Sequence, residues 1–381
     1  MTDARTVLLG DVVQIVSGFA FPSDRFGEVG DLPVVRIRDV VPGYSQTYYR
    51  GDYQVKYLVA DGDLLVGMDG EFNCGTWTGG PALLNQRVCK VVARPDAADQ
   101  GYLRHLLPKT LKSIEARTPQ STVKHLSVRQ IEAIAVTLPP LPDQRRIAAL
   151  LGKADAIRRK RQQAIRLTDD LLRSAFLDMF GDPVTNPKGW PTQPIADVAD
   201  VITGNTPPRE RPEYYGDAIE WIKSDNINTR SHILTRAVEG LSEAGRALGR
   251  AAPEGSTLMT CIAGSRSCIG NVALTDRAVA LNQQINAIVP GPSVDANFLY
   301  VQLLLAKPLI QAASTDSMKG MVSKGRLSSV LLPAPAEERQ RAFGRWFSGF
   351  LHWRSRLDAG CGATDDLFHA LAQRAFRGAG A

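Results

Sequence analysis

The sequence predicts an α+β protein made of two repeated α/β domains, each followed by a long helix. Three observations support this prediction: segments of the first half recur in order in the second half, short apolar runs indicate strands, and an apolar stripe at helical spacing ends each half. A chain of 381 residues also exceeds the size at which a single hydrophobic core usually stops growing. We therefore expect two domains rather than one.

The internal repeat is carried by short matched segments. In chain order the pairs are LGDVVQIVSG (9–18) with IADVADVITG (195–204), GDLLVGMDG (62–70) with GSTLMTCIAG (255–264), ALLNQRV (82–88) with VALNQQI (279–285), YLRHLL (102–107) with FLYVQLL (298–304), and LPPLPDQR (138–145) with LPAPAEER (332–339). Asp39 and Asp225 fall in step between the first two pairs. Because the order is kept throughout, a duplicated unit explains these matches better than coincidence.

Each copy is expected to be one domain plus one helix. The runs VVQIV (12–16), DLLVG (63–67) and RVCKVVA (87–93) indicate strands separated by Gly and Asp turns, and a helix is expected near 101–117. The predicted segments are a first domain at 1–140, a central helical spacer at 141–182, a second domain at 183–335 and a C-terminal helical spacer at 336–381.

The central helix is expected to run from Pro142 to Phe180. Its larger apolar residues recur at intervals of three and four, which predicts one apolar stripe packed along a partner helix. Pro142 and Asp143 suit a first helical turn, and the Gly-Asp-Pro sequence at 181–183 is a typical stop. The helix is long enough to act as a spacer.

The second helix carries a similar stripe from Phe343 to Phe376, so the two helices are expected to pack as an antiparallel coiled coil. Glycine disfavours helix interiors, and Gly360-Cys361-Gly362 is therefore expected to interrupt the second helix. The aromatic residues from Trp346 to Trp353 are interpreted as helix core rather than as a stacking platform for bases.

The basic run Arg158-Arg159-Lys160-Arg161 allows two interpretations. It is interpreted first as a solvated helix face opposite the apolar stripe, because charge runs commonly have that role. The alternative is contact with phosphate or with another subunit.

Composition restricts the class of protein. Lys and Arg total 45 against 39 Asp and Glu, a formal charge of +6 that makes an anionic partner plausible. The N-terminal MTDARTVLLGDVVQIVSGFAF does not fit a secretory signal, and we expect no association with a membrane. The 5 cysteines lack C-x-x-C spacing, so a reducing cytoplasm is the expected location.

These segments resemble the specificity subunits of type I restriction-modification enzymes. PLPDQRRIAALLGKADAIRRKR and LTDDLLRSAFLDMFGDP are similar to the central helical region of that family. ITGNTPPR (202–209) resembles the opening of a target recognition domain, and ASTDSMKGMVSKGRLSSVLLPAP resembles its close. The resemblance covers essentially the whole chain, since the repeated order of domain and helix is itself the layout of the family.

The resemblance implies that each domain is a target recognition domain that reads one half of a split double-stranded DNA sequence. It also implies that the helices hold the domains apart and bind two modification (methyltransferase) subunits and, where the system has them, restriction subunits with ATP-dependent nuclease activity. S-adenosylmethionine, Mg and ATP would belong to those partners, with no cofactor in this chain. The alternative is a helical scaffold whose duplicated domains bind protein or another ligand.

No catalytic motif is found in the sequence. It contains no Asn- or Asp-Pro-Pro-aromatic tetrapeptide and no G-x-x-x-x-G-K-[ST] phosphate loop. Asp217, Glu220 and Lys223 come nearest to a metal nuclease set, but their spacing fits surface carboxylates better. The five histidines are scattered, so we assign no catalytic residue, no metal ligand and no enzymatic activity.

Candidate DNA contacts follow from residue type, because Arg and Lys bind guanine or phosphate and Asn binds adenine. They are Arg36, Arg38, Tyr44, Arg87 and Lys124 in the first copy, and Arg209, Lys223, Asn226, Arg266, Lys319 and Lys324 in the second. Arg266 lies in a Gly-bounded loop that resembles one found at this place in the family. The basic KGMVSKGR segment (319–326) is also expected to be a loop.

Two recurring polar pairs are assigned a structural role instead. Asn85-Gln86 and Asn282-Gln283 stand at matching places between apolar residues. Side-chain amides at such positions commonly bond to nearby backbone, so we expect both pairs to hydrogen-bond within their own domains.

Overall fold

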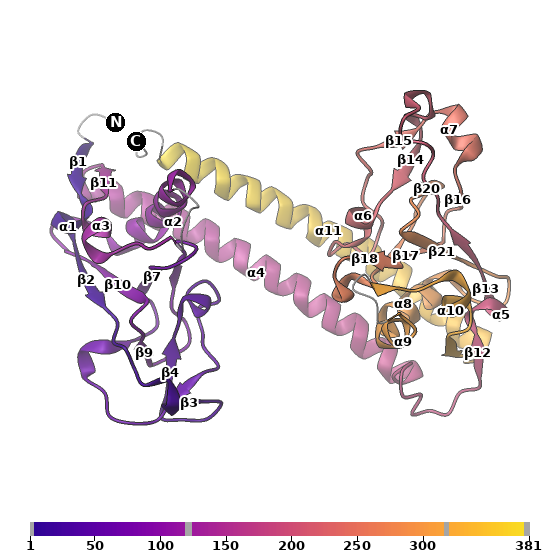
Figure 1. Ribbon diagram of the computed structural model, residues 1–381, viewed down its shortest axis with the longest axis horizontal. Helices are drawn as coiled ribbons and strands as arrows, with labels where there is room; N and C mark the ends of the chain where they lie inside the picture. The colour runs from indigo at the N-terminus through magenta and orange to yellow at the C-terminus, as the bar shows by residue number, and fades with distance from the viewer. Residues whose placement is uncertain (1–3, 119–123, 316–319, 377–381) are drawn as a thin grey trace. The chain divides into compact units, whose positions relative to one another are not determined.

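The computed structural model describes residues 4–118, 124–315 and 320–376 and divides the chain into two compact units (Figure 1). Unit 1 comprises Met1–Gln162 and Gly360–Ala381, and unit 2 comprises Gln163–Ala359. The two long helices, α4 (Leu141–Phe180) and α11 (Glu337–Ala375), each contribute one part to unit 1 and the other part to unit 2. Each unit therefore combines a globular α/β domain with parts of both helices.

The globular part of unit 1 is built on two sheets and a strand pair. Its strands are β1 (Arg5–Leu8), β2 (Val13–Ser17), β3 (Phe26–Gly27), β4 (Leu32–Val35), β5 (Tyr48–Tyr49), β6 (Leu58–Val59), β7 (Leu64–Gly67), β8 (Cys74–Thr76), β9 (Ala82–Leu84), β10 (Val88–Ala93) and β11 (Ala135–Leu138). Its shorter helices are α1 (Leu9–Val12), α2 (Gln100–Arg117) and α3 (Val128–Glu132). The sheets have the orders β2-β10-β7-β8 and β3-β5-β4-β9-β6, and β1 pairs with β11. The expected strands and the helix near 101–117 are confirmed.

The globular part of unit 2 has corresponding elements. Its strands are β12 (Thr192–Pro194), β13 (Ala199–Thr203), β14 (Tyr215–Ile222), β15 (Gly240–Leu241), β16 (Ala251–Ala252), β17 (Thr257–Thr260), β18 (Ile262–Ala263), β19 (Val272–Leu274), β20 (Val279–Leu281), β21 (Ile285–Pro290), β22 (Gly320–Met321) and β23 (Leu331–Pro333). Its helices are α5 (Ile195–Val198), α6 (Ser224–Ile227), α7 (Glu243–Leu248), α8 (Ala296–Leu305), α9 (Lys307–Ala312) and α10 (Lys324–Ser328). The sheet orders are β13-β21-β17-β19 and β15-β14-β20-β16, with pairs β12-β23 and β18-β22.

The predicted duplication is confirmed by the topology of the two units. The antiparallel sheet β2-β10-β7-β8 has the same connectivity as β13-β21-β17-β19. Each second sheet contains one parallel pair, β4 with β9 and β14 with β20. Gly18 and Gly204 follow the first strand of each antiparallel sheet, and a Cβ there would lie 2.0 Å from the Asn85 carbonyl oxygen and 2.2 Å from that of Asn282. Close backbone approach therefore explains why both repeats carry glycine at this position.

A buried glutamine ties the start of each long helix to the domain before it. The Gln144 Oε1 accepts a hydrogen bond from the Asp99 N–H (3.0 Å) while its Nε2 donates to the Pro139 carbonyl (2.9 Å). Gln340 makes the same pair of bonds to Asp295 N–H and a proline carbonyl, at 3.2 and 2.8 Å. Gln144 thus corresponds to Gln340, and the expected letter-by-letter match of LPPLPDQR with LPAPAEER is wrong by two residues.

Within unit 1, the beginning of α4 packs against the end of α11. Arg161 donates hydrogen bonds to the Gly360 carbonyl and to the Thr364 hydroxyl. The Arg158 guanidinium lies 3.6 Å from the Asp365 carboxylate and 5.0 Å from the centroid of the Phe368 ring. The interpretation of this basic run as a solvated face is therefore wrong for its first and last members, which bind the neighbouring helix.

Helix α11 continues without a break through Gly360-Cys361-Gly362, so the expected interruption is wrong. Cys361 is buried, and the Gly360 carbonyl accepts hydrogen bonds from Arg161 and from the Thr364 hydroxyl. Two glycines cost roughly 2 kcal/mol of intrinsic helix stability relative to alanine. Tertiary packing against α4 outweighs that local preference, as is usual for helices inside proteins.

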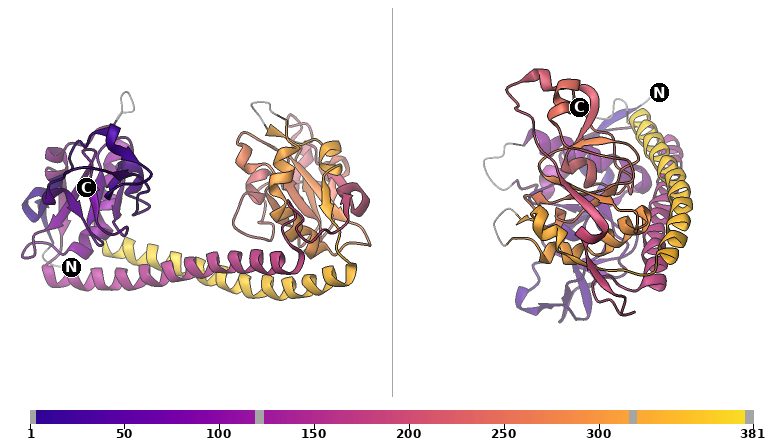
Figure 2. Two further views of the ribbon diagram at one scale, coloured as in Figure 1. Left: turned by 90° about the horizontal axis from the view of Figure 1, so that it is seen from below. Right: turned by 90° about the vertical axis from the view of Figure 1, so that its right-hand side faces the viewer.

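Within unit 2, the end of α4 packs against the beginning of α11, so the helices are antiparallel in each unit (Figure 2). Phe176 is 1% exposed, and its ring centroid lies 5.0 Å from that of Phe180, 5.6 Å from Phe298 and 5.4 Å from Phe343. This aromatic cluster joins α4, α8 and α11 in one core. The stripe interpreted as helix core is confirmed for Phe347 and Phe350, but Trp346 and Trp353 are substantially exposed.

The described helices lack the combined length and hydropathy needed to cross a lipid bilayer. The five cysteines are free thiols. Burial raises the pKa of Cys89 and of Cys261 to about 12, so both thiols stay protonated near neutral pH. Neither thiol is therefore placed to act as a nucleophile.

Candidate nucleic-acid interface

The structure brings Arg36 and Arg38 together in unit 1. They stand before and within a short 3-10 turn at Ile37–Asp39, and each guanidinium lies 3.9 Å from the Asp39 carboxylate. Both also donate to the Thr47 hydroxyl. The Arg38 side chain is 69% exposed and that of Arg36 is 29% exposed, so Arg38 has the freer access to a ligand.

Burial raises the pKa of Asp39, against the opposing influence of a hydrogen bond from Ser45 and the charge of Arg38. The Arg36 backbone N–H also donates to this carboxylate at 2.9 Å. Asp39 therefore has a structural duty, because it fixes the turn from which the two arginines project.

Arg87 and Lys124 each contact the turn that follows β7 in unit 1, Arg87 through its side chain and Lys124 through its backbone. Arg87 Nη1 lies 3.0 Å from the Asp69 carboxylate, which also binds the His125 ring. Lys124 Nζ donates to the Glu115 carbonyl (2.7 Å), and its own carbonyl accepts from the Gly70 N–H (2.8 Å). The role of His125 cannot be predicted from the sequence, because its partner lies 56 residues away along the chain. Tyr44 is 54% exposed and belongs to neither group.

In unit 2, Arg209 and Lys223 converge on Glu239. Arg209 Nη1 lies 2.9 Å from one carboxylate oxygen, and Lys223 Nζ contacts the other. The Arg209 guanidinium also lies 4.7 Å from the ring centroids of both Tyr215 and Trp221. We call Arg209, Tyr215, Trp221, Lys223 and Glu239 the arginine–aromatic cluster. Hydrogen bonds from Lys223 and Arg209 lower the pKa of Glu239, which therefore remains charged.

The arginine–aromatic cluster has the properties of a preorganised reader. The Arg209 side chain is 51% exposed although two rings and a carboxylate fix its position. A guanidinium held in this way loses little conformational entropy when it binds a second acceptor. Arginine is also the side chain that most often binds the O6 and N7 atoms of guanine. The cluster can therefore recognise a base edge.

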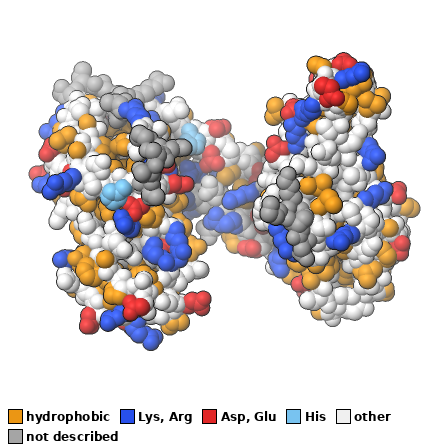
Figure 3. Space-filling view, in the orientation of Figure 1, with side chains coloured by type: hydrophobic (Ala, Val, Ile, Leu, Met, Phe, Trp, Pro, Cys, Tyr) orange, Lys and Arg blue, Asp and Glu red, His pale blue; other side chains and the backbone are white. Residues whose placement is uncertain are grey.

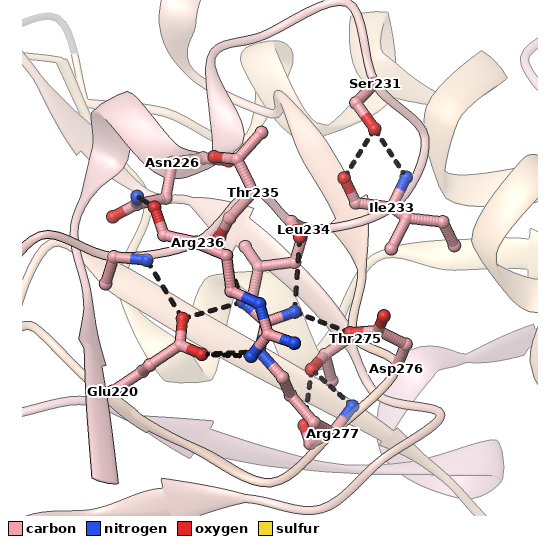
Figure 4. A network of polar contacts seen from close by, with 11 residues as sticks. Glu220, Asn226, Ser231, Ile233, Leu234, Thr235, Arg236, Thr275, Asp276 and Arg277 are labelled. Carbon is pink, nitrogen blue, oxygen red and sulfur yellow. Dashed lines mark hydrogen bonds and ion pairs between the residues drawn. The ribbon is translucent and has the colours of Figure 1, made fainter. Parts of the chain in front are cut away.

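Asn226 lies close by, but both ends of its amide are already bonded. Its Oδ1 accepts from the Lys223 N–H (3.0 Å) and its Nδ2 donates to the Arg236 carbonyl (3.0 Å), as Figure 4 shows for the second bond. Asn226 thus caps helix α6. A base contact through this amide would require at least one of these bonds to break.

Arg266 and Lys324 are not brought together in unit 2, because they follow the two strands of an antiparallel pair and so lie beyond its opposite ends. Strand β18, which precedes Arg266, pairs with β22, which precedes Lys324. The expected loop at KGMVSKGR is wrong in its described part, where β22 is followed by α10 with Ser323 as its N-cap. Capping by Ser323 and pairing with β18 order this segment. Lys319 lies outside the described residues.

The two recurring Asn-Gln pairs behave differently. Asn282 Oδ1 accepts from the Gln284 N–H at 3.0 Å, which confirms the expected bond within its own domain. Asn85 is buried, but its Oδ1 has no hydrogen-bond partner among the described residues, so the expectation is wrong for this atom.

Glu220 does not join Asp217 and Lys223 in a metal site. Its carboxylate accepts from the Arg277 Nε and Nη2 (2.8 and 2.7 Å), the Arg236 Nη1 (2.6 Å) and the Ala237 N–H (2.9 Å; Figure 4). The bond from Arg277 is the main reason that the pKa of Glu220 falls to about 2. In the part of the chain that the structure describes, no group of His, Cys, Asp and Glu could hold a metal ion.

The substitution Glu220→Gln is expected to destabilise unit 2 by about 2 kcal/mol at neutral pH, because it removes charge-assisted hydrogen bonds from the largely buried Arg277. The pKa of this carboxyl is lower in the folded chain than its ordinary value of 4.5. Its contribution is therefore complete above pH 4.5 and is lost as the pH falls toward about 2. Urea unfolding at neutral pH and in acid should show a difference that shrinks with acidity. The control Glu254→Gln, at an exposed position, should leave the free energy of unfolding unchanged both at neutral pH and in acid.

Basic side chains are distributed as separate groups on the face that Figure 3 shows. Within each unit, Lys and Arg lie among hydrophobic and uncharged side chains rather than in one continuous basic surface. A continuous basic surface would favour binding to phosphate alone, whereas separate groups on ordered elements suit recognition of particular bases.

Comparisons with known proteins agree with this arrangement. The family model described as "Type I restriction modification DNA specificity domain" matches the chain twice, over residues 1–167 and 187–355. The type I restriction enzyme EcoBI specificity subunit of Escherichia coli is 28% identical over 421 residues, which cover 98% of this chain and 85% of that protein. The HindI specificity subunit of Haemophilus influenzae is 31% identical over 141 residues, covering 36% of this chain and 28% of that protein.

A solved structure shows the same fold. The S subunit of a type I restriction-modification system from M. genitalium superposes with a TM-score of 0.66, covering 98% of this chain and 96% of that chain at 12% identity. The predicted class, two repeated α/β domains with long antiparallel helices, is therefore confirmed.

Proposed function

Because this chain belongs to the family of type I restriction-modification DNA specificity subunits, we propose that its two domains each read one half of a split double-stranded DNA target. The observation that carries the proposal is the double match of the family model, once over most of each repeat. The same match favours DNA reading over the alternative of a helical scaffold that binds protein or another ligand.

Different side chains in the two units support independent readers. Unit 1 presents Arg38 and Arg87 on turns, whereas unit 2 presents Arg209 from the arginine–aromatic cluster. Direct readout depends on the donors and acceptors that reach the base edges. Two copies of one fold with different polar groups can therefore select two different half-sites.

The long helices are the proposed docking surface for partner subunits. We propose two modification (methyltransferase) subunits and, in systems that cleave DNA, restriction subunits with ATP-dependent nuclease activity. S-adenosylmethionine, Mg and ATP would be bound by those partners. The chain itself is a non-catalytic specificity subunit, as its relatives are, and we propose that it acts in the cytoplasm.

The direct test is to map methylated bases by long-read sequencing in cells that express a modification subunit with or without this chain. A split motif should appear only when this chain is present. A stable complex of the two proteins that produces no new motif would instead favour the scaffold alternative.

The substitution Arg209→Ala is expected to reduce discrimination at one base pair of the half-site read by unit 2 by about 10- to 100-fold, because a bidentate arginine contributes that much to base selection. Competition binding with DNA duplexes altered at single positions measures this effect. Arg211→Ala is the matched control, since Arg211 is 61% exposed and pairs with Glu213 rather than with the arginine–aromatic cluster. Uniform weakening on all sequences would identify Arg209 as a phosphate contact instead.

A further inference from the structure

Unit 2 contains a cleft of about 400 Å³ that none of the candidate DNA contacts lines. It lies between α4, α8 and the segment Thr229–His232. Its apolar lining comes from Ile165, Leu172, Val272, Leu304 and Leu305. This volume is that of a small ligand pocket.

Three arginines also line the cleft, Arg166 and Arg173 from α4 and Arg230 from the loop before His232. All three are exposed, and within the described chain none of them has an ion pair or a side-chain hydrogen bond. Arginines elsewhere in unit 2 are mostly paired with carboxylates, as Arg236 and Arg277 are with Glu220. The cleft therefore has unneutralised positive charge above an apolar floor.

One wall of the cleft is a chain of polar contacts. His232 Nδ1 lies 2.9 Å from the Tyr300 hydroxyl, and its Nε2 lies 3.6 Å from the Asp169 carboxylate, beyond direct hydrogen-bond distance. Asp169 also binds Arg354, whose side chain is only 3% exposed. Burial would raise the pKa of Asp169, but the nearby His232 ring and the hydrogen bond and charge of Arg354 lower it, so the carboxylate stays charged.

This wall sets the charge balance of the cleft. Asp169 and Asp358 both bind Arg354, and neither carboxylate lies within ion-pair distance of Arg166, Arg173 or Arg230. The buried ring of His232, fixed by Tyr300, holds the loop that carries Arg230 in place. The cleft is consequently formed before any ligand arrives, which lowers the entropic cost of binding.

We propose that this cleft binds an acidic, partly apolar segment of a modification subunit. The proposal rests on the proposed recruitment of that subunit. Carboxylates on the segment would pair with the three arginines, and its apolar side chains would cover Leu304 and Leu305. A DNA backbone offers phosphates but would leave the apolar floor uncovered, so charge and apolarity together favour protein as the occupant.

The test uses the full chain with Arg166→Glu and Arg173→Glu introduced together, and a purified modification subunit as the probe. Both arginines are exposed and make no ion pair in the described structure, so the fold should be unaffected. Calorimetric titration should show binding weaker by on the order of 100-fold, because like charges would face each other. DNA binding by the variant alone should match that of the wild-type chain.

Arg145→Glu is the matched control, because Arg145 is also exposed on α4 but belongs to unit 1. It should leave affinity at the cleft unchanged. Equal affinity of the double variant and the wild-type chain for the subunit would overturn the proposed role of the cleft but not the proposed recruitment. Loss of DNA binding with subunit binding intact would assign the cleft to DNA and also overturn it. Failure of the wild-type chain to bind the subunit would overturn the proposed recruitment as well.

Discussion

Exchange of residues 1–140 for the corresponding domain of another family member is expected to replace one half of the DNA target and leave the other half unchanged. The arginine–aromatic cluster lies wholly within unit 2, and each unit has its own hydrophobic core. Sequencing of methylated bases in cells that carry the exchanged chain and a modification subunit measures the outcome. A change in both halves of the motif would contradict the proposal of two independent readers.

The donor domain must satisfy the contacts that the long helices make with it. Gln144 binds the Asp99 N–H, and Leu151 and Phe376 belong to the same core as Tyr102 of α2. A donor with any residue except proline at the position of Asp99 and an aromatic residue at that of Tyr102 keeps those contacts. The reciprocal exchange of residues 183–335 is the matched control and should alter only the other half of the motif.

Phe176→Ala is expected to destabilise unit 2 by about 3–5 kcal/mol, the usual cost of removing a fully buried aromatic ring. Phe176 is 1% exposed and contacts rings from α8 and α11 as well as Phe180 of its own helix. Its loss leaves a cavity where three elements meet. Because a chain with two units need not unfold in one step, native-state hydrogen exchange is the measurement to use.

The hydrogen-exchange data should show which elements lose stability. Amides of α8 should lose protection in the variant, while those of α2 in unit 1 should keep it. Leu171→Ala on the same helix is the control, because Leu171 is 49% exposed and its truncation should cost less than about 1 kcal/mol. Equal loss of protection in α2 and α8 would show that the units unfold as one.

The fold could be predicted from the sequence wherever a local pattern decided the structure. Strand β10 and helix α2 carry periodic apolar residues, and both lie where the pattern placed them. The unbroken path of α11 through Gly360 could not be predicted, because glycine propensity is local whereas its compensation comes from Arg161 on another helix. The correct alignment of the two repeats at the start of the long helices follows from Gln340, which corresponds to Gln144. Apolar patterns do not reveal the role of a single polar residue.

The candidate site was less predictable, since partners are distant in the chain. Residue type alone indicates Arg209 and Lys223. It does not indicate their partner Glu239, which lies 30 residues from Arg209. Residue type predicts Asn226 as a candidate adenine contact, yet its amide caps a helix. Sequence indicates which side chains can bind a base, and only the fold shows which of them are already occupied.

The order of synthesis gives unit 1 an unusual folding history. Its globular part is made first, but residues 360–376, which complete its core through Phe376, are made after all of unit 2. Unit 2 is continuous in sequence and can reach its native state on the ribosome as soon as Ala359 emerges. The first domain to leave the ribosome is thus the last to mature, and until then it leaves Tyr102 and its neighbours accessible to chaperones.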